Sequence, residues 1–142
     1  MPERFAVVIG LAAAVMVAVL AIRFWNLRRV KQLRHAAPLW DALGETPDGR
    51  RTLVAFSTRS CAACHTAQAP AVKAVEQQLG ASELRVIHVD ASRQPEVART
   101  FGVLTVPSTV VLEPEGRIVA INQGFAPSRR LIEQLQRAPA TV

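Results

Sequence analysis

Two cysteines, Cys61 and Cys64, are the side chains in this sequence best suited to covalent chemistry, and they stand in the stretch "SCAACH". The Cys-x-x-Cys spacing is typical of a thiol–disulfide redox pair, whereas the same spacing followed by histidine is also the attachment motif of a c-type haem. The chain has only these two cysteines, so they cannot form a scaffold of structural disulfides. Their role must be local, and the surrounding elements must decide between the two chemistries.

The cysteine pair lies where a predicted strand gives way to a predicted helix. Thr52–Phe56 ("TLVAF") is a short run of β-branched and aromatic residues, which predicts a buried strand. From Ala62 to Leu79 apolar residues recur at helical spacing, beginning with Ala67, and Gly80 is a natural end for the helix. We therefore expect Cys61 and Cys64 at the first turn of a long helix.

The rest of the chain continues to alternate between strands and helices. Leu84–Val89 predicts a second strand, and Pro95–Phe101 predicts a helix with proline in its first turn. Ser108–Leu112 and Arg117–Ile121 predict a hairpin around a Glu-Pro-Glu-Gly turn, and an amphipathic helix follows Pro127. The order is βαβαββα, an α/β fold with a mixed four-stranded sheet and a parallel crossover.

A helix that begins at the cysteine pair has a chemical consequence. Only a thiolate attacks a disulfide, and a free thiol with a pKa of about 8.5 is mostly protonated at neutral pH. The unpaired N–H groups of a first helical turn favour an anion, and Cys-x-x-Cys pairs in that setting reach pKa values of about 3.5–7. We expect Cys61, on the outer edge of the turn, to be the nucleophile and Cys64 to be the resolving thiol.

The element order and two motifs resemble the thioredoxin-fold family over residues 38–138. The motifs are Cys61-Ala62-Ala63-Cys64 and "GVLTVPS", in which Val106-Pro107 stands where the family places a cis-proline facing the dithiol. The resemblance implies a thiol-disulfide oxidoreductase that needs no cofactor or metal, and substrate peptides that pair with the backbone at Val106 and Pro107. It also implies protein disulfides as substrates and an upstream thiol reductant as electron donor.

Several positions depart from the family pattern. Ser60 replaces the usual tryptophan, and Ala55 stands where many members have a buried acid. Deprotonation of Cys64 then needs another base, for which His65 is the nearest candidate in the sequence; the alternative is a plain surface histidine. Too few residues precede the first strand for the additional amino-terminal strand of the family.

A hydrophobic segment precedes the predicted domain. Phe5–Ile22 is an uncharged run long enough for a helix to cross the roughly 30 Å hydrocarbon layer, and it is longer than the apolar core of a cleaved signal peptide, which is the alternative. We expect a single-pass anchor at residues 1–25, a basic juxtamembrane linker at 26–37, the domain at 38–138 and a tail at 139–142. More basic residues flank the carboxyl end of the span than its amino end, and the more basic flank of a span tends to stay in the cytoplasm. This favours a cytoplasmic domain; an extracytoplasmic domain is the alternative.

Charge and ligand chemistry restrict the remaining functions. Residues 1–35 carry a net charge of +5 out of +6 for the whole chain, so the domain itself has only +1 and no support for binding nucleic acid. A haem needs a second axial ligand, and the only methionines, Met1 and Met16, lie before or within the hydrophobic segment. A zinc site from the cysteines and neighbouring histidines is equally disfavoured. Three hypotheses stay open: a cytoplasm-facing disulfide reductase, an extracytoplasmic redox protein for cytochrome c or disulfide maturation, and a non-catalytic peptide-binding module.

Overall fold

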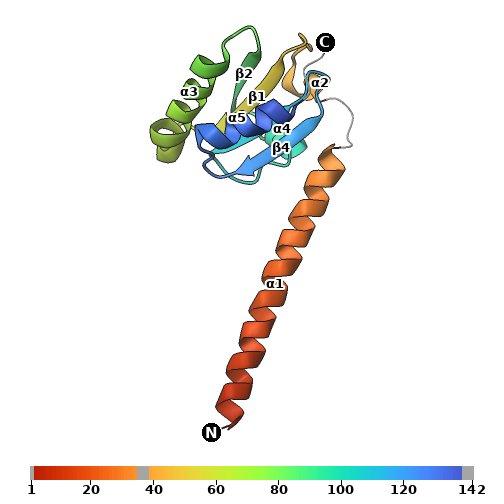
Figure 1. Ribbon diagram of the computed structural model, residues 1–142, viewed down its shortest axis with the longest axis vertical. Coiled ribbons are helices and arrows are strands. Elements are labelled where there is room, and N and C mark those ends of the chain that lie inside the picture. Colours follow the sequence, from red (N-terminus) through yellow and green to blue (C-terminus); the bar gives the residue numbers. More distant parts are fainter. Residues whose placement is uncertain (1, 35–38, 139–142) are drawn as a thin grey trace. The chain divides into compact units, whose positions relative to one another are not determined.

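The computed structural model describes residues 2–34 and 39–138, which form two separate units (Figure 1). The first unit is one long helix, α1 (Pro2–Arg34), within which Val7–Trp25 is long and apolar enough to cross a membrane. A signal sequence meets the same criterion, so α1 is a candidate span. The helix continues through most of the segment expected as a linker, while residues 35–38 and the expected tail at 139–142 lie outside the described residues.

The second unit contains a four-stranded sheet in the order β2-β1-β3-β4. Its strands are β1 (Arg51–Ser57), β2 (Leu84–Asp90), β3 (Ser108–Leu112) and β4 (Ile118–Gln123). β1 pairs with β2 in parallel, whereas β1 with β3 and β3 with β4 are antiparallel. This is the predicted mixed sheet, and no strand precedes β1 in the part of the domain that the structure describes.

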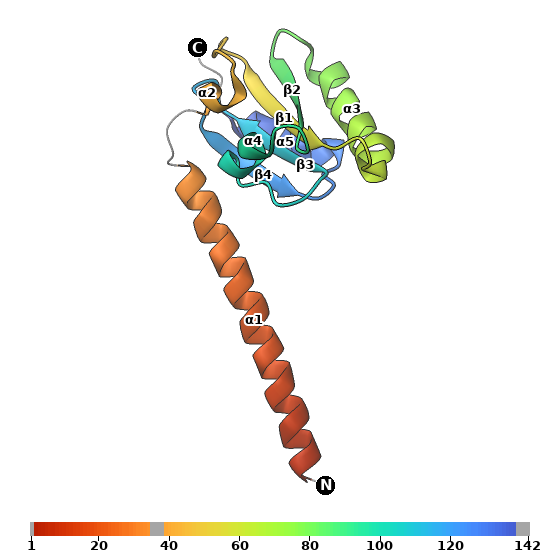
Figure 2. The ribbon, with the colours of Figure 1, turned by 180° about the vertical axis from the view of Figure 1, so that it is seen from behind.

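Helices cover both faces of this sheet, as Figures 1 and 2 show from opposite sides. Successive residues of β1 point to opposite faces, so Leu53 and Ala55 join one apolar cluster and Val54 and Phe56 join the other. The first cluster includes residues of α3 (Ala69–Leu79) and α5 (Ser128–Arg137), and the second includes residues of α4 (Pro95–Thr100). The sheet is therefore buried on both faces, and functional groups must lie at its ends.

The helix that carries the cysteine pair begins irregularly. A wide π-helical segment, η1 (Cys64–Gln68), precedes α3, and Pro70 stands in the first turn of α3. The expected apolar stripe began at Ala67, but Ala67 is only partly buried and the buried residue is Gln68. Gln68 lies four residues after the buried Cys64 and four before the buried Val72, so it shares their face of the helix.

The amino-terminal end of the domain is fastened by Trp40, the first residue of the short helix α2 (Trp40–Leu43). The buried indole donates a hydrogen bond from Nε1 to the Pro114 carbonyl at 3.2 Å, across the β3–β4 turn. Gly116 in that turn has φ +87°, and a Cβ there would lie 2.7 Å from the Trp40 ring. The indole thus occupies space that only glycine leaves free.

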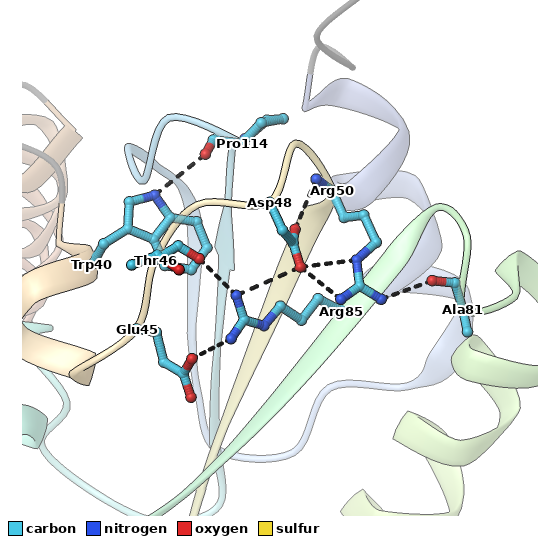
Figure 3. Close-up of polar contacts among 8 residues, drawn as sticks. All are labelled: Trp40, Glu45, Thr46, Asp48, Arg50, Ala81, Arg85 and Pro114. Carbon is cyan, nitrogen blue, oxygen red and sulfur yellow. Dashed lines mark hydrogen bonds and ion pairs between the residues drawn. The ribbon is translucent and has the colours of Figure 1, made fainter.

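A polar network fixes the chain between α2 and β1 against the start of β2 (Figure 3). Arg85 of β2 donates to the Thr46 carbonyl at 2.8 Å, pairs with Glu45, and lies with its guanidinium 5.7 Å from the centre of the Trp40 ring. Arg50 joins the network through its ion pair with Asp48 at 2.6 Å. The hydrogen bond from Arg50 lowers the pKa of the Asp48 carboxyl below its usual value. These contacts hold the entry segment in place without an additional strand.

Candidate active site

Strand register brings three loops to the same end of the sheet. Phe56 near the end of β1 pairs with Ser108 at the start of β3, and Ser108 pairs with Gln123 at the end of β4. The cysteine turn follows β1, the Val106-Pro107 segment directly precedes β3, and a loop beginning at Gly124 directly follows β4. The carboxyl end of β2 lies at this end too, because the Ala91 N–H donates to the Ser57 carbonyl at 2.9 Å.

The two cysteines form a disulfide with each other, with their Cα atoms 5.3 Å apart. Cys61 is partly exposed, whereas Cys64 is buried, with only 4% of its surface accessible. The Cys64 backbone N–H donates to the Cys61 Sγ at 3.2 Å, so a donor is already directed at this sulfur. In the reduced protein the same N–H stabilises negative charge on Cys61, since a hydrogen bond to the charged form favours that form.

His65 points back toward the turn that leads into Cys61. Its exposed ring lies with Nε2 3.2 Å from the Arg59 carbonyl oxygen. A carbonyl only accepts hydrogen bonds, so Nε2 carries the proton in this contact, and the Nδ1 of a neutral ring holds the lone pair. The structure thus places His65 beside the cysteine turn, with Nδ1 as the nitrogen that can take a proton.

The Val106-Pro107 segment lies at the end of the sheet that carries the cysteines, as expected. The peptide bond between the two residues is cis, Val106 is partly exposed and Pro107 is buried. Thr105 and Leu104, which precede them, are exposed, and 66% of the Leu104 surface is accessible. The segment therefore presents the apolar Leu104 and the polar Thr105 to solvent, beside the partly exposed Val106.

Two glutamines that sequence reasoning missed also contribute to this region. Gln68 is buried, donates to the Ala126 carbonyl at 3.0 Å and accepts the Ala126 N–H at 2.9 Å. Gln123 makes side-chain contacts with the loop before β3. Phe125, in the loop between Gln123 and Ala126, is 49% exposed. A polar residue among apolar positions of a helix was the only signal for Gln68, and nothing in the sequence pattern marked Gln123.

The cysteine pair, the Val106-Pro107 segment and the sheet order together match known proteins. The thioredoxin family model matches residues 39–137. The chain belongs to the thioredoxin family. Thioredoxin of Bacillus subtilis is 29% identical over 93 residues, which cover 66% of this chain and 86% of the relative. The prophage-derived thioredoxin-like protein YosR of the same organism is 35% identical over 66 residues, covering 45% of this chain and 82% of that protein. Fasciola hepatica thioredoxin superposes with a TM-score of 0.55 at 27% identity, over 64% of this chain and 83% of that structure.

Family membership confirms the predicted fold and the redox role of the paired cysteines. Thioredoxin-family proteins act on protein disulfides, and this family member is a thiol-disulfide oxidoreductase with a disulfide-forming Cys61–Cys64 pair. Ala55 is buried in β1, and as an alanine it supplies no acidic group there. Within residues 2–34 and 39–138, no three His, Cys, Asp or Glu side chains gather in a group that could hold a metal ion.

Proposed function

We propose that this protein is a membrane-anchored reductase of protein disulfides, with Cys61 as the nucleophile and Cys64 as the resolving thiol. The observation that carries the proposal is the unequal exposure of the pair: Cys61 is partly open to solvent and Cys64 is buried. A substrate disulfide reaches Cys61 first for this reason. The N–H that Cys64 directs at the Cys61 sulfur favours the thiolate that attack requires.

The reaction has two exchange steps. The Cys61 thiolate attacks one sulfur of the substrate disulfide, which forms a mixed disulfide and releases the other substrate sulfur as a thiolate that takes up a proton. The Cys64 thiol then loses its proton and attacks the Cys61 sulfur, which forms the Cys61–Cys64 disulfide and releases the second substrate thiol. Two electrons have passed to the substrate, and a dithiol reductant must return the pair to its reduced form.

His65 is the proposed acceptor of the Cys64 proton. The support is its place next to Cys64 and the contact of its Nε2 with the Arg59 carbonyl, which leaves Nδ1 as the basic nitrogen. We expect the resolving step to slow in a His65→Leu variant, because the nearest proton acceptor is removed. Rapid-mixing kinetics of mixed-disulfide decay measure this step, and an unchanged rate would remove His65 from the mechanism.

Val106 and Pro107 form the proposed substrate-binding segment. Val106 is partly exposed and lies at the end of the sheet that carries Cys61, where an extended substrate peptide can add as a short strand. A Val106→Ala variant, which keeps the backbone, is expected to retain most of its affinity for peptide, since the main chain supplies the hydrogen bonds.

Membrane attachment through α1 with a cytoplasmic domain is the proposed location. The support is the apolar stretch Val7–Trp25, with Arg23 near its carboxyl end and Arg28, Arg29, Lys31 and Arg34 after it, against Arg4 alone before the stretch. Basic residues flanking a span tend to stay in the cytoplasm. A cytoplasmic and a periplasmic reporter, each fused after Val142, test this assignment. Activity of the periplasmic reporter would instead support the extracytoplasmic hypothesis.

Turnover tests the activity itself. Full-length protein in detergent, supplied with a dithiol reductant, is expected to reduce insulin disulfides catalytically, and Cys61→Ser is expected to abolish this turnover. Wild-type protein that reacts no faster than Cys61→Ser would contradict the proposal and would favour the non-catalytic peptide-binding module.

A further inference from the structure

The side chain of Gln123 contacts the loop before β3 at three points. Its Nε2 donates to the Gly102 carbonyl at 2.8 Å, and its Oε1 accepts the Leu104 N–H at 3.1 Å. The same Oε1 lies 3.2 Å from the Ser108 Oγ, whose hydroxyl hydrogen is shared with the Thr105 carbonyl at 2.6 Å. One amide thus joins the beginning, middle and end of this loop.

The Gln123 side-chain contacts begin where the backbone hydrogen bonds between β3 and β4 end. The antiparallel ladder between β3 and β4 ends at the Ser108–Gln123 pair, and residues 103–107 belong to no helix or strand. A glutamine amide offers one carbonyl acceptor and one N–H₂ donor group, the same two functions as a peptide unit. The side chain of the last residue of β4 therefore extends the hydrogen bonding of the sheet by one step into the loop.

The segment that carries Gln123 is itself fixed at its other end. Gln68, from the helix of the cysteine pair, holds both backbone groups of Ala126. Within the described part of the domain, the exposed large apolar side chains are Leu104 and Phe125, and each lies next to one of these amide contacts in the chain. The two loops beside the cysteines are thus both held by glutamine side chains.

We propose that Gln123 is a positioning residue that holds the Leu104–Pro107 segment in the conformation that receives the substrate peptide. This inference rests on the proposed function, in which Val106 and Pro107 bind substrate. Gln123 has no described contact with Cys61 or Cys64, so its removal acts on substrate binding and leaves the thiol chemistry intact. Uniform loss of binding raises KM and spares kcat.

The test compares two chemically identical substitutions in the full-length protein. Gln123→Met keeps the length of the side chain and removes its hydrogen bonds. Gln134→Met is the matched control, because Gln134 exchanges two hydrogen bonds with Asn122, at 2.8 and 2.9 Å, and has no described contact with the loop. The Ser108 hydroxyl keeps its bond to Thr105, so the substitution removes the partner of two groups, the Gly102 carbonyl and the Leu104 N–H. With about 1 kcal/mol for each of these two hydrogen bonds, we expect Gln123→Met to raise the KM for insulin about fivefold to thirtyfold and Gln134→Met to leave it unchanged.

Two further readouts separate positioning from general damage. Reaction of the reduced proteins with the small aromatic disulfide dithiobis-nitrobenzoate, which needs no peptide-binding loop, is expected to proceed at equal rates in both variants and the wild type. Hydrogen exchange at the Leu104 amide, followed by NMR, is expected to accelerate in Gln123→Met alone. Gln123→Glu, which keeps an acceptor for the Leu104 N–H and loses the donor to Gly102, is expected to show an intermediate KM.

Equal KM values for the two methionine variants, or unchanged Leu104 exchange in Gln123→Met, would overturn the inference. The inference would also be overturned if Gln123→Met lost as much rate toward the small disulfide as toward insulin, because Gln123 would then affect the reactivity of the Cys61–Cys64 dithiol. Failure of the wild type to turn over insulin contradicts the proposed function itself, whereas wild-type turnover with equal KM values contradicts the role of Gln123 alone.

Discussion

Replacing Gln68 by leucine is expected to destabilise the domain strongly, although leucine is more apolar and the site is buried. Only 4% of the Gln68 surface is accessible, and its amide is the partner of both the N–H and the carbonyl of Ala126. Ala126 is fully buried, so neither group can turn to water instead.

The loss of stability can be worked out from the Ala126 N–H and carbonyl, which lose their hydrogen-bond partner in the variant. A buried donor or acceptor that loses its partner is destabilising by about 1–3 kcal/mol, which gives roughly 2–6 kcal/mol for the pair. Additional apolar burial by leucine offsets about 1–2 kcal/mol of this. We therefore expect the free energy of unfolding to fall by about 1–4 kcal/mol.

Urea denaturation of the full-length protein in detergent, followed by tryptophan fluorescence, measures this loss, since Trp40 is buried in the domain. Gln77→Leu is the matched control, because Gln77 is an exposed glutamine of the same helix. We expect Gln77→Leu to change the free energy of unfolding by less than about 0.5 kcal/mol, as is usual for surface substitutions. Equal stability of the two variants would refute the claim that Gln68 holds the loop after β4.

Further predictions concern the far end of the sheet. Gly44 and Gly116 both have positive φ, but only a Cβ at Gly116 would meet the Trp40 ring. We therefore expect Gly44→Ala to lower the free energy of unfolding, measured in urea, by about 1–2 kcal/mol and Gly116→Ala to lower it by about 2–5 kcal/mol. Equal losses would show that the Trp40 ring moves aside to make room for the Cβ. The hydrogen bond from Arg50 lowers the pKa of Asp48, so the carboxylate stabilises the fold above its ordinary pKa of 3.8, and this contribution is lost as pH falls through the lower, folded-state pKa. The stability gap between wild type and Asp48→Asn should therefore be largest well above pH 3.8 and shrink as the pH falls below that value; a gap independent of pH would contradict this reasoning.

Most strands and helices of the fold could be predicted from the sequence, because the patterns that indicate them are local and repeated. Short β-branched runs and helical apolar spacing predicted each strand of the sheet, and Ser108–Leu112 was predicted with its observed bounds. The spacing of Cys61 and Cys64 and the "TVPS" stretch placed the site at one end of the sheet. These signals depend only on neighbours in the chain, which is why they were readable.

Side-chain contacts between distant segments were not readable in this way. Gln68 hydrogen bonds to a residue 58 positions away, and Gln123 to one 21 positions away. Gln68, and not the adjacent Ala67, is the buried residue at this point of the helix, because it lies four residues from both Cys64 and Val72. No periodic pattern encodes such pairs, because a glutamine that is buried and one that is exposed look alike until the fold brings their partners together.

The central claim is that Cys61 attacks and Cys64 resolves, and trapping the mixed disulfide tests it most directly. Full-length Cys64→Ser and Cys61→Ser proteins are reduced, mixed with a disulfide-bonded peptide and analysed by mass spectrometry. Because Cys61 is partly exposed and Cys64 is buried, we expect a stable peptide adduct on Cys61 in the Cys64→Ser protein and little adduct in the Cys61→Ser protein. An adduct that forms on Cys64 as fast as or faster than on Cys61 would contradict the account.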